Sequence, residues 1–241
     1  MTDLVVLVPS RGRPDKVMEL MAAFDATCRA YTELLIVVDD DDDSDYAAAS
    51  SGCANLMVVR RPDPRRRGMV HALNTAAGRV VNTREDVPFA VGFMGDDHRP
   101  RDIGWDAAYL TELSDLGTGI VYGDDLLQGK RLPTQVAMTT DIVRTLGFMA
   151  PPVLRHLYVD NFWRDLGRGA GCLRYLEDVV VEHVHPAAGK AQDDAGYRAV
   201  NSSLMWALDR GAYDGFVRSG GLAAAVDLVA GLRTDAEAVP S

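Results

Sequence analysis

The feature that most constrains this chain is an alternation of short, wholly apolar runs with stretches of amphipathic helical spacing. The apolar runs span residues 4–9, 34–38, 56–59 and 88–94. Between them, apolar residues recur every three or four positions after Pro14 and again after Gly68, as on one face of a helix. Strands that are apolar on both faces and separated by helices form a parallel sheet covered on each side. We therefore predict an α/β fold with a mostly parallel central sheet flanked by helices.

The second half of the chain continues this mixed pattern less regularly. Expected strands cover residues 118–122, 134–138 and 173–185, and expected helices cover residues 141–146 and 159–166. Residues 186–196 are rich in Gly, Ala and Asp, which predicts a loop, and residues 197–233 favour helix with glycine breaks.

The charge of the chain is acidic overall but unevenly distributed. The 241 residues carry a formal net charge of −10, with six aspartates among residues 39–45 and five arginines among residues 60–67. Proteins that coat nucleic acid gain most of their affinity by neutralising phosphates, so the net charge argues against that class. The arginine strip can still meet phosphates locally.

Composition also favours a particular compartment. No apolar run approaches the ~20 residues that cross a bilayer, so we predict no membrane insertion. The first residues lack the basic and long apolar regions of a secretory signal. Cys28, Cys53 and Cys172 are odd in number and widely spaced, which disfavours a disulfide framework or a cysteine zinc site. We expect a reduced, cytoplasmic protein.

Polar turns follow each apolar run at the point where the strand should end. These turns cover residues 10–14, 39–43, 60–67 and 95–98. Right-handed crossovers bring the carboxyl ends of parallel strands to one edge, where open α/β sheets bind ligands. We therefore expect the turns to converge on one site.

Two pairs of residues have the chemistry of a metal site. Asp96 and Asp97 follow a buried strand, and carboxylate oxygens suit Mg²⁺ or Mn²⁺. His183 and His185 are two apart in an extended segment, so both rings face one side. Two alternatives stay open: the aspartates cap a helix starting near Asp102, and the histidines bond to backbone carbonyls.

Basic and acidic turns alternate along this edge, as a metal-bridged nucleotide diphosphate requires. Asp39 ends a buried strand and is placed to bond a base or ribose, whereas consecutive aspartates repel, so residues 41–45 should face solvent. Arg11, Arg13 and arginines 65–67 can form charge-assisted hydrogen bonds to phosphates.

The helix expected over residues 159–166 carries a candidate general base. If the helix extends back to His156, then His156, Asp160 and Arg164 share one face. Asp160 suits the role of base, with Phe162 and Trp163 excluding water. The alternative is a surface ion pair between Asp160 and Arg164, which contributes little.

In this order along the chain, these segments resemble the GT-A glycosyltransferases, in particular family 2-like enzymes and their phage-encoded relatives. The matching segments are residues 8–14, 37–40, the Arg-Gly-x-x-x-Ala-Leu-Asn stretch at 67–74, and residues 93–97 and 182–185. The resemblance implies a GT-A (Rossmann-like) nucleotide-sugar-binding and catalytic domain over residues 1–187. Residues 188–241 would be a mobile loop and a helical C-terminal extension of that domain.

The resemblance also implies roles for individual residues. Asp97 would bind the metal in an altered Asp-x-Asp motif, in which Gly95 replaces the first aspartate, and His183 or His185 would complete the metal shell. Asp160 would be the base. The nucleotide sugar would be held by matching residues and by a lysine of the mobile loop: Pro9, Ser10, Arg11, Arg13, Asp39, Arg67, Asn74, Asp96 and Lys190.

We therefore predict a glycosyltransferase dependent on Mn²⁺ or Mg²⁺ that moves a sugar from a nucleotide-diphosphate sugar to an acceptor hydroxyl, with inversion. Phage-encoded relatives modify DNA bases or virion proteins, and both acceptors stay open. Two alternative functions also stay open. A sugar nucleotidyltransferase usually has a glycine-rich first loop with a lysine, where this chain has Gly12 alone. A non-catalytic nucleotide or sugar-binding module would suit the altered motif.

Overall fold

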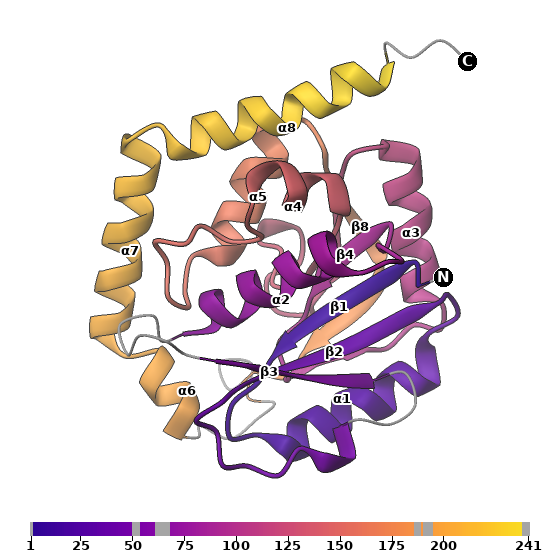
Figure 1. Cartoon of the computed structure of the whole chain (residues 1–241), viewed down its shortest axis with the longest axis vertical. Coiled ribbons are helices and arrows are strands. Elements are labelled where there is room, and N and C mark those ends of the chain that lie inside the picture. Colours follow the sequence, from indigo (N-terminus) through magenta and orange to yellow (C-terminus); the bar gives the residue numbers. More distant parts are fainter. Residues whose placement is uncertain (1, 50–53, 61–67, 186–188, 190–194, 238–241) are drawn as a thin grey trace.

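The computed structural model describes residues 2–49, 54–60, 68–185, 189 and 195–237 (Figure 1). The first half contains β1 (Leu4–Pro9), α1 (Pro14–Thr27), β2 (Thr32–Asp39), η1 (Ala47–Ala49), β3 (Ala54–Val59), α2 (Met69–Thr83) and β4 (Ala90–Phe93). The middle contains β5 (His98–Pro100), α3 (Trp105–Leu116), β6 (Ile120–Asp124), η3 (Gly129–Arg131), β7 (Val136–Thr139), α4 (Thr140–Leu146), α5 (Val159–Gly169) and β8 (Leu173–His183). The C-terminal part contains α6 (Ala195–Val200), α7 (Ser203–Arg218) and α8 (Gly221–Glu237).

The strands form one mixed sheet in the order β3-β2-β1-β4-β7-β6-β8-β5. Strands β3, β2, β1 and β4 are parallel, and β6 is parallel to β8. Strand β7 is antiparallel to both of its neighbours, and β5 is antiparallel to β8. The predicted mostly parallel α/β sheet is confirmed. The reversal at β7 follows from the short β6–β7 connection, because a parallel crossover needs a dozen or more residues.

Strand β1 shows why both faces of the sheet are covered. Val5 and Leu7 are fully buried in a cluster with α2, α4 and α5. Leu4, Val6 and Val8 are buried in a second cluster with α1 and α3. Because successive side chains of a strand point to opposite faces, a continuous apolar run can serve two cores at once. A register slip of one residue would keep β1 apolar but would move the turn that follows it.

The C-terminal helices pack on the outside of one layer. Figure 1 shows α8 lying over α4 and α5, and α7 running along the edge of the molecule. Ala225 and Val229 of α8 are buried in the core. Among the described residues, no single helix is long and apolar enough to cross a membrane, although α7 and α8, bent by 62°, pass that length and composition test as a pair.

Asp106 ties the opposite end of the sheet together. Its fully buried carboxylate, in the first turn of α3, accepts hydrogen bonds from the N–H groups of Arg29 and Ala30 and from the hydroxyl of Thr32, at 2.7–3.2 Å. These groups connect α1 to β2. A buried carboxylate stabilises the fold only while hydrogen bonds from its neighbours compensate for its lost contact with water.

We predict that Asp106→Ala lowers the free energy of unfolding by about 2–4 kcal/mol, because buried donors lose their acceptor. Urea denaturation measures the change. Asp115→Ala, on the exposed end of the same helix, is the matched control and should stay within about 0.5 kcal/mol of the parent. Equal stabilities of the two variants would contradict the assigned role.

Candidate functional site

The turns after β1 and β4 are joined by a buried carboxylate. Ser10 Oγ donates to Asp96 Oδ2 at 2.7 Å, and Arg13 Nη1 lies 3.3 Å from Asp96 Oδ1. Burial raises the pKa of Asp96 to about 6, and the neighbouring charge of Asp97 adds to this, while Arg13 and Ser10 oppose it. The convergence expected of these two turns is therefore present. The helix-cap alternative does not hold, since α3 begins at Trp105 with Gly104 as its N-cap.

The turn after β2 joins the same site. Arg11 Nη1 lies 3.3 Å from Oδ2 of the buried Asp39 and 2.5 Å from Asp41 Oδ1. Asp42 accepts from the Gly12 N–H at 2.8 Å and from the Tyr46 hydroxyl at 3.3 Å.

The expectation that aspartates 41–45 all face solvent is wrong for Asp42. Asp41, Asp43 and Asp45 are exposed, but Asp42 is half-buried. Desolvation raises the pKa of Asp42, and hydrogen bonds from Ser44, Gly12 and Tyr46 outweigh it, so the net shift is downward. The first loop uses this carboxylate to fix its shape. Tyr46, whose hydroxyl also lies 3.3 Å from Ser10 Oγ, was not predicted, although it is the lone aromatic after the acidic run.

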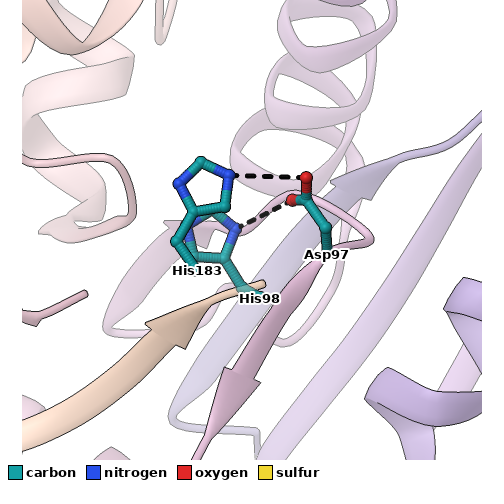
Figure 2. Close-up of side chains that lie close together, drawn as sticks. All are labelled: Asp97, His98 and His183. Carbon is teal, nitrogen blue, oxygen red and sulfur yellow. Dashed lines mark ion pairs between the residues drawn. The ribbon is translucent and has the colours of Figure 1, made fainter. Parts of the chain in front are cut away.

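Asp97, His98 and His183 come together where β4, β5 and β8 meet. Figure 2 shows the Asp97 carboxylate facing both imidazole rings. Asp97 Oδ2 lies 3.4 Å from His183 Nε2, and Asp97 Oδ1 lies 3.5 Å from His98 Nδ1. Desolvation raises the pKa of Asp97, but the two histidines outweigh it and hold the pKa well below its ordinary value. A carboxylate kept ionised beside imidazole nitrogens is a ligand set for a divalent cation.

His98 supports this cluster by packing against His183. Its Nδ1 accepts the Gly95 N–H at 3.0 Å, so the hydrogen-bond pattern assigns the ring proton to Nε2, which lies 3.4 Å from Thr134 Oγ1. The ring stacks on His183 with centroids 4.3 Å apart and an interplanar angle of 18°. Since its Nδ1 lone pair is already used, His98 positions His183 and leaves ligation to Asp97 and His183.

His183 is the residue whose surroundings fit a metal best. Its Nδ1 is buried and has no hydrogen-bond partner within the described part of the chain. If the proton is on Nε2, the Nδ1 lone pair is unmatched. If the proton is on Nδ1, the Nε2 lone pair faces the Asp97 carboxylate, which cannot donate. A divalent cation between Nε2 and Asp97 would give this lone pair and the carboxylate a shared partner, so the residues present fit Mn²⁺ or Mg²⁺. The alternative that backbone carbonyls satisfy this ring does not hold.

His185 lies on the same side as predicted, with its ring centroid 4.6 Å from that of His183 and 5.0 Å from that of Tyr197. Burial lowers the pKa of His185, and the charge of His183 adds to the shift. A neutral imidazole is the form of histidine that ligates metals.

Asp125 supports this cluster and was not predicted from the sequence. Its backbone carbonyl accepts the His183 N–H at 2.9 Å, and its carboxylate accepts the Thr134 hydroxyl at 2.7 Å. It therefore holds His183 directly and His98 through Thr134. A signal was present: residues 123–125 repeat the Gly-Asp-Asp of residues 95–97 at the end of another strand.

Gly95 explains the departure from the Asp-x-Asp pattern. A Cβ atom at this position would lie 2.6 Å from Asp97 Oδ1 and 3.1 Å from His98 Nδ1. The Asp97 carboxylate, a candidate metal ligand, occupies the space that a side chain at residue 95 would take. A glycine is therefore required for Asp97 to reach its place beside His183.

Asp160 lies in the first turn of helix α5. Desolvation raises its pKa, and a hydrogen bond from the Asn161 N–H at 2.9 Å opposes the shift only partly. Asp160 is close enough to His183 for their charges to interact. Arg164 pairs with Asp165 at 2.8 Å, so a simple Asp160–Arg164 ion pair is not the arrangement.

The loop before α5 is held from two sides. Asp209, a buried residue of α7, accepts the N–H groups of residues 155, 156 and 157 at 2.7–3.0 Å. At the start of α2, the Val70 N–H donates to the Arg155 carbonyl at 3.1 Å. Helix α5 starts at Val159, as expected, and does not extend back to His156, since these bonds hold residues 155–157 in a loop. Asp209 was also not predicted from the sequence.

Other predicted residues are placed less directly. Asn74 bonds to the backbone of residues 149 and 150 through both amide atoms, at 2.7–3.0 Å, which leaves one of its N–H groups available. Pro9 ends β1 and precedes the first loop. Arg67 and Lys190 lie outside the described residues, as do arginines 65 and 66; their roles stay predictions.

No protein-family model matches the sequence, and no curated protein matches it. Solved structures with a similar fold do exist. The crystal structure of S. aureus TarS superposes with a TM-score of 0.59 at 13% identity, covering 75% of this chain and 36% of TarS. This chain thus spans about a third of that protein.

Two further structures match over most of their length. The mannosyltransferase PcManGT from Pyrobaculum calidifontis, solved with GDP-Man and Mn²⁺, has a TM-score of 0.58 at 17% identity, covering 99% of this chain and 76% of PcManGT. Glucosyl-3-phosphoglycerate synthase from Mycobacterium tuberculosis, solved with Mn²⁺, UDP-glucose and glycerol 3-phosphate, has a TM-score of 0.57 at 14% identity, covering 88% and 80%. The neighbours are glycosyltransferases, and the predicted GT-A fold is confirmed.

We predict that Gly95→Ala weakens Mn²⁺ binding by about tenfold, because the new methyl group displaces the Asp97 carboxylate. The melting temperature should hardly change, since the end of a side chain can shift without disturbing the core. Calorimetric titration with MnCl₂ measures the affinity. Gly78→Ala in α2, where a Cβ would meet nothing within 4 Å, is the control. Unchanged affinity in Gly95→Ala would refute the explanation.

We also predict a pH dependence of stability from His156. Desolvation lowers its pKa from 6.5 to about 4, outweighing the nearby carboxylate of Asp209. In the unfolded state His156 takes up a proton near pH 6.5, whereas in the folded state it does so only near pH 4. Stability is therefore lost as the pH falls from about 6.5 to about 4.

This loss has a slope of at most about 1.4 kcal/mol per pH unit, and His156→Gln should remove it. Denaturation of both proteins across the window measures the difference. Above pH 7.5 the two stability curves should run parallel, and parallel curves throughout would show that His156 does not resist protonation.

Proposed function

We propose that this chain is a metal-dependent glycosyltransferase that uses a nucleotide-diphosphate sugar. The observation that carries the proposal is the approach of His183 Nε2 to Asp97 Oδ2, at 3.4 Å, which brings an imidazole nitrogen and a carboxylate together at the sheet edge beside the first loop. Similar folds solved with Mn²⁺ and nucleotide sugars support this chemistry.

Asp97 and His183 would hold Mn²⁺ or Mg²⁺, with His185 as a further ligand. The bound cation would supply positive charge that stabilises the departing diphosphate. His98 keeps the His183 ring in place by stacking, and Asp125 fixes the His183 backbone. Partners of this kind usually matter nearly as much as the ligands they orient.

The first loop and Asp39 would bind the nucleotide. Asp39 is buried at the end of β2, where an ionised carboxylate can accept hydrogen bonds from a base or a ribose. Arg13 lies against Asp96, which places a guanidinium beside the metal cluster, where the phosphates would sit. We propose Ser10 and Arg11 as loop contacts, and Arg67 and Lys190 as further phosphate contacts.

Asp160 would act as the general base. Its raised pKa makes the ionised carboxylate a stronger base than an ordinary aspartate. It would accept the proton of the acceptor hydroxyl as that oxygen attacks the anomeric carbon from the side opposite the diphosphate, which inverts the configuration. For the acceptor, this proposal includes the two classes that phage-encoded relatives modify, DNA bases and virion proteins. It also includes a cytoplasmic location.

The two alternative functions differ in their products. A sugar nucleotidyltransferase would release pyrophosphate, whereas the proposed enzyme releases a nucleoside diphosphate. A binding module would release neither. Incubating the protein with MnCl₂ and a panel of UDP- and GDP-sugars, and identifying the phosphate product, separates the three.

We predict that EDTA or Asp97→Asn abolishes donor turnover, and that added MnCl₂ restores the EDTA-treated protein but not the variant. The amide keeps the shape of the side chain but loses the charge that holds the cation. Asp43→Asn, in the exposed part of the acidic run, is the control and should retain full turnover. Turnover that persists in EDTA would refute the metal-dependent mechanism.

We predict that Asp160→Asn lowers transfer to the acceptor by about 10²–10⁴-fold, since the hydroxyl loses its proton acceptor. Donor and Mn²⁺ affinities should stay unchanged. In the parent enzyme, transfer should fall on the acidic side at a pH above the ordinary aspartate range, because Asp160 must be ionised. Wild-type transfer rates in Asp160→Asn would assign the base to another residue.

A further inference from the structure

A pocket separate from the metal cluster lies between the loop before α5 and the exposed face of α7. It has a volume of about 480 Å³, which is within the range of small-ligand sites. Its lining combines aromatic, charged and very small residues: Tyr158, Trp206, Ala207, Arg210, Gly211 and Asp214. Figure 1 shows α7 along the outside of the molecule, and Trp206, Arg210 and Asp214 of this helix are exposed.

Trp206 provides an accessible aromatic face. Its side chain is 46% exposed, whereas Trp105 and Trp163 are each 1% exposed. Its ring meets Tyr158 edge to face, with centroids 5.8 Å apart, and Tyr158 in turn stacks on Tyr213 at 5.7 Å. An indole held rigidly by a second aromatic ring can pack against a flat, weakly polar surface at little entropic cost. The C–H face of a pyranose ring is such a surface.

Arg210 and Asp214 provide donors and acceptors beside this face. Arg210 Nε lies 4.0 Å from Asp214 Oδ2, and the two side chains are 72% and 52% exposed. A pair at this distance and exposure is weakly bound, so both groups can turn to hydrogen-bond ligand hydroxyls. Together they are formally neutral, which matches a neutral polyol and disfavours a polyanion such as nucleic acid.

The pocket is connected to the proposed base. Tyr158 lies two residues before Asp160 and has a left-handed backbone with φ of 66°, a conformation that a non-glycine residue adopts only where its surroundings impose it. Asp209, adjacent to Arg210 in α7, clamps the loop that leads to Tyr158. The charge of Asp160 also acts on Tyr213, the residue beneath Tyr158. The pocket therefore shares Tyr158 with the segment that leads into the first turn of α5, where Asp160 lies.

We propose that this pocket is an acceptor subsite that binds a neutral sugar ring, stacked on Trp206 and hydrogen-bonded by Arg210 and Asp214. The acceptor is then a glycoside or oligosaccharide that presents a hydroxyl to Asp160. This assignment rests on the proposed function for its catalytic meaning, but sugar binding itself can be tested without it.

Gly211 offers a sharp test, because a Cβ there would meet nothing within 4 Å. Gly211→Leu starts a side chain in open space within the pocket lining and so should obstruct the pocket. Gly215→Leu, one turn further along α7 and equally unobstructed, is the matched control outside the pocket lining. Trp206 is the accessible indole, so acrylamide quenching of tryptophan fluorescence reports on it. The probes are maltose, cellobiose, lactose and chitobiose, with a single-stranded oligonucleotide as a further arm.

We expect at least one disaccharide to protect Trp206 from quenching in the parent protein and in Gly215→Leu, but not in Gly211→Leu. Transfer to that disaccharide should show a KM raised about tenfold or more in Gly211→Leu and in Trp206→Ala, as for removal of an aromatic anchor. Gly215→Leu should keep the KM and the donor turnover of the parent protein.

Two results would overturn the assignment: protection by none of the disaccharides, or protection by the oligonucleotide alone. Sugar protection without any donor turnover would instead contradict the proposed function and leave the sugar site standing. Donor turnover without sugar protection would support the proposed function and contradict the sugar site.

Discussion

The buried carboxylate of Asp96 is the interaction on which the site depends. It accepts hydrogen bonds from Ser10 and Arg13, and so ties the turn after β4 to the turn after its neighbouring parallel strand β1. An ionised group inside a protein is costly unless it stays paired, so neither turn can move away alone. The position of Asp97, the next residue, follows from this link.

A second layer of contacts holds the metal-ligand candidates, and it comes from the repeated Gly-Asp-Asp sequence. The copy after β4 provides Asp97 itself. The copy at the end of β6 provides Asp125, which binds the His183 backbone and, through Thr134, supports His98. The two identical tripeptides therefore have different roles, because one lies beside the first loop and the other lies at the end of β6, the strand next to β8. Sequence similarity between them gives no indication of that division.

The C-terminal helices contribute to the site as well as to the core. Helix α8 covers α4 and α5, while α7 uses Asp209 to hold the loop from which Asp160 emerges. The same helix presents Trp206 and Gly211 toward that loop. Loss of the helical extension would therefore release the base and remove the neighbouring pocket together, which couples stability of this region to the proposed chemistry.

The sequence by itself determined most of the strands and helices, though not β5, and the edge of the sheet where Asp39, Asp96 and Asp97 gather, because hydrophobic period and strand-end turns are local properties. It also paired His183 with His185 on one side. Only the tertiary structure showed that Asp42 folds the first loop, and that Asp125 and Asp209 anchor the histidines and the base. Asp42 and Asp209 bond through their carboxylates, and Asp125 through its backbone carbonyl, to groups far away in the chain, and such partners leave no period or spacing in a single sequence.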